Sequence, residues 1–135
     1  MLFPGRLLAV AFLATACVAA CGRKQEGSTR VRTVGSLTGE LIPAPDPPSV
    51  GLDTDFTVLL STQGRPLSGA QVSVALMFRS MNQTGPSAVC TPVAPGRYVA
   101  SGLTTGMNGK WEAVVTVAHP SQPHAQLVFP FVVTK

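Results

Sequence analysis

The chain has 135 residues, of which 45% are hydrophobic and 12% are charged, and its formal net charge at pH 7 is +4. This length is enough for one domain around one core and not for two. Four of the ten basic residues lie between positions 23 and 32, in a polar stretch without apolar periodicity. Charge placed in this way predicts a flexible segment near anionic head groups and argues against nucleic acid as a partner.

The first twenty residues have the pattern of an export signal. One basic residue, Arg6, precedes an apolar run over residues 7–16, which is too short to cross a bilayer as a helix. The next stretch, "VAAC", resembles the lipobox of bacterial lipoproteins. That resemblance implies a diacylglycerol on the sulfur of Cys21, cleavage before this residue and acylation of the new amino group. Gly22, in place of an aspartate, resembles the outer-membrane sorting signal of Gram-negative lipoproteins.

We therefore predict a lipoprotein signal peptide over residues 1–20, a flexible tether over 21–34 and one folded domain over 35–135. Two or three acyl chains hold a protein on a bilayer firmly, because each buried CH₂ contributes about 0.8 kcal/mol. The membrane is thus the first expected partner, and the expected location is the cell envelope, on the outer membrane facing the periplasm if the host is Gram-negative. Two alternatives stay open, namely an ordinary signal peptide and cleavage before Cys17.

Cys90 is the only thiol left in the chain if Cys17 is removed and Cys21 is acylated. No internal disulfide can then form, although an exported protein meets an oxidising compartment. Preceded by Ala88 and Val89, Cys90 is predicted to be a small buried hydrophobic residue. A reactive or metal-binding thiol is the alternative.

From about residue 35 onward the sequence is typical of short strands. Residues 43–49 contain four prolines, which exclude a helix and favour an extended connection. Later runs alternate with period two, and a further strand is expected over residues 96–103. Pro130 lacks a backbone donor, so the last strand should lie at a sheet edge or be bulged there. The residues predicted to face the core are Phe56, Val58 and Leu60; Ala70, Val72, Val74, Leu76 and Phe78; Trp111, Ala113, Val115 and Val117; and Leu127, Phe129, Phe131 and Val133.

Turns rich in glycine and proline separate these runs, and no window predicts an amphipathic helix. The predicted fold class is all-β, an antiparallel immunoglobulin-like β-sandwich of about seven strands. Gly96 and Gly109 are expected in turns that need a positive φ. Tyr98 and Trp111 each need a partner for their polar tip when buried. Arg97 is expected as a solvated neighbour of Glu112.

Several segments together resemble the YtkA-like domain, a relative of the FixH-type proteins found beside bacterial cation pumps and copper-dependent oxidases. They are "GLDTDFTVLL", "GRPLSGAQVSVAL", "APGRYVASGL" and "MNGKWEAVVTV", within residues 51–117. The most specific of them is "PGRYVA", followed after six residues by Met107, Gly109 and Trp111. The resemblance implies an immunoglobulin-like fold and a setting in which copper is handled.

The methionines are the candidate ligands. Met77 is predicted on the strand face opposite the core, Met81 follows four residues later, and Met107 lies in the turn "TTGMNG". Thioethers together with imidazoles select Cu(I), so we treat Met77, Met81 and Met107, with His119 and His124, as candidate metal ligands. Copper is the one cofactor that this pattern suggests, and nothing in the sequence requires it.

The alternatives to a metal site stay open. YtkA-like relatives often carry a proline between their methionines, whereas this chain has Arg79 there, and a cation beside a metal is unfavourable unless it points away. Methionine also fills irregular gaps in packing, and histidines in a loop containing proline are often plain solvated residues. If Met77, Met81 and Met107 bind no metal, their role is structural.

No catalytic motif occurs: the chain lacks G-x-S-x-G, H-E-x-x-H and a Gly-rich phosphate loop ahead of a helix, so we do not predict an enzyme. Two functions remain. The first is binding or delivery of copper or another soft cation in the envelope, with a copper-handling partner. The second is a structural or interaction module that presents a sheet face or edge to another envelope protein.

Overall fold

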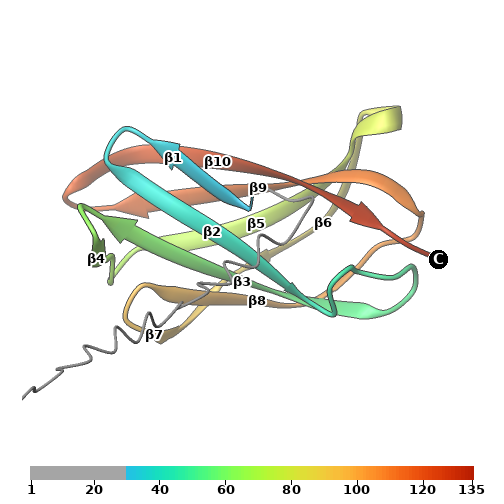
Figure 1. Cartoon of the computed structure of the whole chain (residues 1–135), viewed down its shortest axis with the longest axis horizontal. Coiled ribbons are helices and arrows are strands. Elements are labelled where there is room, and N and C mark those ends of the chain that lie inside the picture. Colours follow the sequence, from blue (N-terminus) through green and yellow to red (C-terminus); the bar gives the residue numbers. More distant parts are fainter. Residues whose placement is uncertain (1–29) are drawn as a thin grey trace, which may run out of the picture.

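The computed structural model describes residues 30–135. The predicted signal peptide, Cys17, Cys21, Gly22 and most of the predicted tether lie outside the described residues. Within residues 30–135 the chain forms ten β-strands and one short 3₁₀ helix, arranged as two antiparallel sheets packed face to face (Figure 1). None of its helical segments in this range has the length and apolar character needed to span a bilayer.

The first sheet has the order β1-β2-β3-β8-β7, and β4 pairs with β3 beside β8. Its strands are β1 (Val31–Val34), β2 (Leu37–Ala44), β3 (Asp53–Thr62), β4 (Arg65–Pro66), β7 (Thr91–Ala94) and β8 (Arg97–Thr104). The second sheet has the order β10-β9-β5-β6. Its strands are β5 (Gln71–Phe78), β6 (Gln83–Val89), β9 (Gly109–His119) and β10 (Gln122–Val133), and η1 (Arg79–Met81) joins β5 to β6. The all-β, immunoglobulin-like sandwich predicted from the sequence is confirmed.

The core lies between the two sheets and is built from the predicted inward faces. Every residue of those faces is buried except Ala70, which packs against the core while partly exposed. Across the two sheets the rings of Phe56 and Phe131 meet edge to face, with centroids 5.5 Å apart. Period-two alternation therefore specifies which side of each strand faces inward, because successive side chains of a strand point to opposite faces.

The N-terminal boundary and the strand count differ from the predictions. Residues 31–34, expected in the tether, form β1 and pair antiparallel with β2. Just before them, the carbonyl of Arg30 accepts a hydrogen bond from the amide of Leu41, and its guanidinium pairs with Asp46. The count rises from about seven to ten because β1, β4 and β7 have four residues or fewer, too short for alternation to be recognised.

The turn glycines, Pro130 and Tyr98 have the local structure that the sequence predicts. Gly96 and Gly109 have φ of +69° and +132°. Pro130 lies in β10, which is an edge strand, and its register with β9 continues through the proline. The buried hydroxyl of Tyr98 donates to the carbonyl of Leu67 at 2.7 Å and accepts from the amide of Ala70 at 3.1 Å. It thereby ties the β4–β5 connection to the core.

Candidate functional site

The three candidate methionines lie at one end of the sandwich, here called the methionine end. It consists of Met77 in β5, Met81 in η1 and Met107 in the loop between β8 and β9. Phe78, the last residue of β5, pairs with Trp111 near the start of β9, so η1 and the β8–β9 loop emerge side by side. Figure 1 shows both at the end that also carries the C-terminus.

An indole holds the backbone of this end in place. Trp111 is buried and its Nε1–H donates to the carbonyl of Met107 at 3.0 Å. Its ring packs on Phe78, with centroids 5.1 Å apart. Across β6, a Cβ on Gly85 would lie 2.7 Å from the indole, so only glycine lets this strand approach so closely. The loop that carries Met107 is thus fixed through its main chain.

The thioether side chains themselves are not used by this packing. Met81 is 64% exposed and Met107 is 36% exposed, while Met77 is half-buried. Met77 pairs with Glu112 and therefore faces outward from the second sheet, whereas Trp111 and Phe78 face the core. Met81 and Met107 are consequently the freer pair, and Met77 lies on the outer face of the same end.

The cation that interrupts the methionines is paired. Arg79 Nε binds Glu112 Oε1 at 2.9 Å, and Glu112 sits opposite Met77 in the β5–β9 register. The partner predicted for Glu112 was Arg97, and this was wrong because Arg97 is in β8 of the other sheet. Only the cross-strand register, with Phe78 opposite Trp111, brings Arg79 to this carboxylate. The sequence alone does not contain that information.

The two histidines lie at the other end of β9. Met107 precedes the first residue of β9 and His119 is its last, so about 30 Å of strand separate them. Nδ1 of His119 accepts from the amide of Ser121 at 3.1 Å, and since that amide can only donate, the neutral ring carries its proton on Nε2. Nε2 then donates to the carbonyl of Ser68 at 2.9 Å. Both ring nitrogens of His119 are engaged, and exposed His124 lies near the start of β10, at the same end of the sheet and far from the methionines.

The side chains that could ligate a metal in residues 30–135 limit the kind of ion that fits. Among residues 30–135, no three His, Cys, Asp or Glu side chains gather closely enough to hold a metal ion. Cys90 is buried, and desolvation raises the pKa of its thiol to about 11, so the thiolate that metals require is disfavoured. The thioethers of the methionine end are the donors that fit a soft cation.

Several solved structures resemble this fold. A DUF4426 family protein from Pseudomonas aeruginosa matches with a TM-score of 0.59 and 12% identity, covering 77% of this chain and 96% of that one. FetP from uropathogenic Escherichia coli, recombinantly expressed in the periplasm, matches with a TM-score of 0.59 and 8% identity over 79% of this chain and 94% of its own. A copper-bound variant of FetP matches at 0.58 and 9% over 76% and 92%. At such identities the likeness shows the fold.

No curated protein matches the sequence. The model of the YtkA-like family matches residues 33–116, a span that runs from β1 through most of β9. It includes both turns of the methionine end, the indole that fixes them and the Arg79–Glu112 pair. The chain therefore belongs to the YtkA-like family.

Proposed function

We propose that this protein is a non-enzymatic binding module of the cell envelope that holds a soft cation, with Cu(I) as the first candidate, at its methionine end. One observation carries the proposal: Met81 and Met107 come from separate segments to one end and are exposed there, while Trp111 fixes the backbone of Met107. Thioethers select Cu(I) over harder ions.

The guanidinium of Arg79 at this end is paired with a carboxylate. Arg79 would oppose a metal if its guanidinium were free, but its Nε is bound to Glu112. The pair is close to neutral, so the repulsion felt by a cation nearby is reduced. That a variant of FetP binds copper on the same fold supports the assignment of this ion class.

The lipid anchor belongs to the same proposal. Diacylglycerol on Cys21 would hold the module at the membrane, where a copper-handling envelope protein is the expected partner. Gly22 favours the outer membrane in a Gram-negative host, and the recombinant production of FetP in the periplasm shows that this fold is compatible with an envelope location. Labelling cells with radioactive palmitate tests this, because Cys21→Ser should abolish incorporation and Cys17→Ser should retain it. The reverse result would place the lipid on Cys17.

A competition titration tests the ion. The segment 22–135 contains every buried residue of the sandwich and lacks the anchor cysteine. Under anaerobic, reducing conditions Cu(I) is titrated into it against a coloured chelator, for wild type, Met77→Leu and the Met81→Leu, Met107→Leu double variant. Leucine keeps the apolar volume and removes the sulfur. We expect the double variant to lose affinity by at least about tenfold, as loss of metal-site groups commonly does.

The matched control is a His119→Gln, His124→Gln double variant, which changes two side chains at the opposite end. It should bind Cu(I) like wild type. If wild type cannot compete with the chelator, or if both double variants bind equally well, the methionine end is not a metal site.

A second function is favoured by the outer face of the second sheet. Val128, Val114 and Ala75 are direct cross-strand neighbours on β10, β9 and β5, and Met77 follows Ala75 on the same face. This apolar row would suit contact with another envelope protein. A photo-crosslinking residue at Val114 should then yield a discrete adduct in cells, while one at Val99, on the outer face of the first sheet, should not. Equal labelling at both positions would count against a specific partner here.

A further inference from the structure

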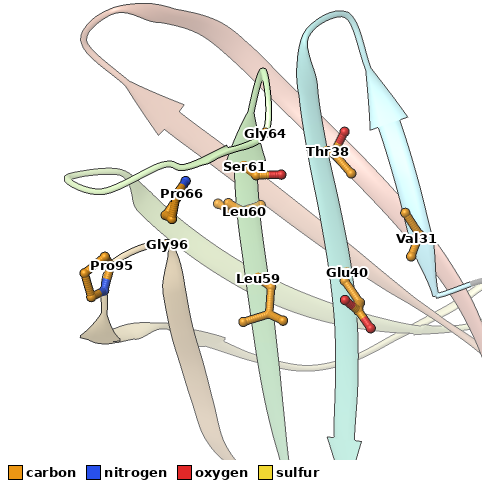
Figure 2. A pocket seen from close by; sticks show the side chains of 10 residues that line it. All are labelled: Val31, Thr38, Glu40, Leu59, Leu60, Ser61, Gly64, Pro66, Pro95 and Gly96. Carbon is orange, nitrogen blue, oxygen red and sulfur yellow. The ribbon is translucent and has the colours of Figure 1, made fainter.

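A hollow of about 290 Å³ lies on the outer face of the first sheet (Figure 2). It is far from the methionine end, where β2 and β3 meet β4 and the β7–β8 turn. Apolar side chains line part of it and polar ones the rest: Leu59, Pro66 and Pro95, and Thr38, Glu40 and Ser61. Its volume is at the lower limit of small-molecule sites, so it suits a short ligand or one side chain.

Strand register places one carboxylate between apolar neighbours. Glu40 on β2 pairs with Val31 on one side and with Leu59 on the other. One step along the same face, Thr38 pairs with Ser61, which sets two hydroxyls beside each other about 7 Å from the carboxylate-bearing position. The hollow thus combines one charge, two hydroxyls and an apolar surface.

The wall of the hollow is fixed by a glycine. The carbonyl of Gly96 accepts a hydrogen bond from the amide of Leu60 at 2.8 Å. A Cβ on Gly96 would lie 2.7 Å from the carbonyl oxygen of Leu60 and 2.8 Å from Cβ of Pro66. Only glycine lets the β7–β8 turn close on β4. The two stretches "GRPLSG" and "APGRY", thirty residues apart, therefore meet here and build one rigid rim.

Glu40 differs from Asp46 and Glu112 in its lack of a partner of opposite charge among the described residues. Asp46 is paired with Arg30 and Glu112 with Arg79, whereas Glu40 makes no ion pair and no side-chain hydrogen bond within the described part of the chain. Arg97 lies across Leu59 on β8, two strands or about 10 Å away, which is close to the screening length at physiological salt. The carboxylate is open to an external cation.

We propose that this hollow binds a primary ammonium group carried on an alkyl chain. The ammonium would donate to the carboxylate of Glu40 and to the hydroxyls of Thr38 and Ser61, which together match its three donors. The alkyl chain would lie on Leu59, Pro66 and Pro95, as the stems of long cationic side chains lie on apolar surfaces. A free alkyl diamine and the lysine side chain of a protein share this chemistry.

The test is a titration followed by amide ¹H–¹⁵N NMR on the segment 22–135. The probes are 1,4-diaminobutane, Nα-acetyl-lysine amide and, as an uncharged comparison, 1-butanol. We expect saturable shifts of the amides of Thr38, Leu59 and Ser61 with both amines and none with the alcohol. Tighter binding of the diamine would identify a free amine as the ligand, and tighter binding of the lysine derivative would identify a protein side chain.

Two variants with the same change of charge complete the design. Glu40→Gln should weaken amine binding by about fivefold or more, since a hydrogen bond to a charged group is lost. Glu112→Gln, on the other sheet, should leave it unchanged. Unaltered amide shifts away from the hollow show that each variant is folded. Shifts that survive in Glu40→Gln, that appear equally with 1-butanol, or that never saturate with either amine overturn the proposal.

Discussion

The two ends of β9 use their functional side chains in opposite ways. At the histidine end, the imidazole of His119 is itself a structural element, because it joins Ser68 to the turn at Ser121. At the methionine end, Trp111 holds the main chain of Met107 while the side chains of Met81 and Met107 stay exposed. A side chain already bound to the fold has little left for a ligand, so burial and hydrogen bonding separate candidate ligands that residue type alone does not.

The largest effect should come from loosening the methionine end. Trp111→Phe removes the indole N–H that holds Met107 and leaves a gap beside Gly85. We expect a loss of about 2–3 kcal/mol in the free energy of unfolding, from the cavity and the unpaired carbonyl together. Urea denaturation measures it. A loss below about 0.5 kcal/mol, the range of ordinary surface substitutions, would mean that the loop is held by other contacts.

The buried thiol of Cys90 provides a second contrast with the exposed side chains of Met81 and Met107. The buried thiol of Cys90 should not react with thiol reagents at neutral pH, because burial raises its pKa to about 11. The folded state therefore keeps its proton above the ordinary value of 9.0, at which the unfolded thiol ionises, and stability should fall as pH rises from 9 towards 11. Unfolding curves across this window measure it, and Cys90→Ala should flatten the fall. An equal fall in the variant would assign it to other groups.

The histidine end should respond less. His119→Ala removes the hydrogen bonds to Ser68 and Ser121, whose groups can turn to water, so we expect a loss of about 1 kcal/mol in the free energy of unfolding. His124→Ala and Met81→Leu, at exposed side chains, should stay within about 0.5 kcal/mol of wild type. Thermal unfolding of the three variants ranks them. If Met81→Leu proved as costly as His119→Ala, the two ends would not differ as described.

A small effect on stability is also expected at the ion pair of the methionine end. Arg79 is largely exposed, so Glu112→Gln should change the free energy of unfolding by no more than about 1 kcal/mol. The same change leaves the guanidinium unpaired beside the proposed site, and Cu(I) affinity should fall. The double change Arg79→Gln, Glu112→Gln should restore the affinity. A failure of this rescue would show that Glu112 matters for another reason.

Period-two alternation was sufficient to predict the inward faces of β3, β5, β9 and β10, because each has at least eight residues and one wholly buried side. The missing backbone donor of Pro130 separately predicted an edge or a bulge, and β10 is an edge strand. It did not reveal β1, whose four residues are held by pairing with β2 and by Arg30. Leu37 and Leu41 are both buried and lie two residues before and two residues after Gly39. Their spacing fits the period-two alternation and could have identified β2.

The candidate site could be predicted only as a set of residue types. The sequence indicates Met77, Met81 and Met107, but their shared end follows from the β5–β9 register, which depends on tertiary packing. His119 looks equally suited to a metal until its contact with Ser68, 51 residues away, is known. The hollow around Glu40 forms where β4 and the β7–β8 turn meet, and these segments are about thirty residues apart in the sequence. No local sequence pattern predicts it.

Arg30 is the first described residue and lies at the open end of the β1–β2 hairpin. A force applied at Arg30 would load the sandwich through this hairpin. A pull away from β2 would peel the hairpin one bond at a time, starting with the 2.9 Å bond between Arg30 and Leu41. A pull along β1 would load its four residue pairs together. The guanidinium, bound to both oxygens of Asp46 at 2.5 and 2.6 Å, reinforces the first bond that a peeling force meets.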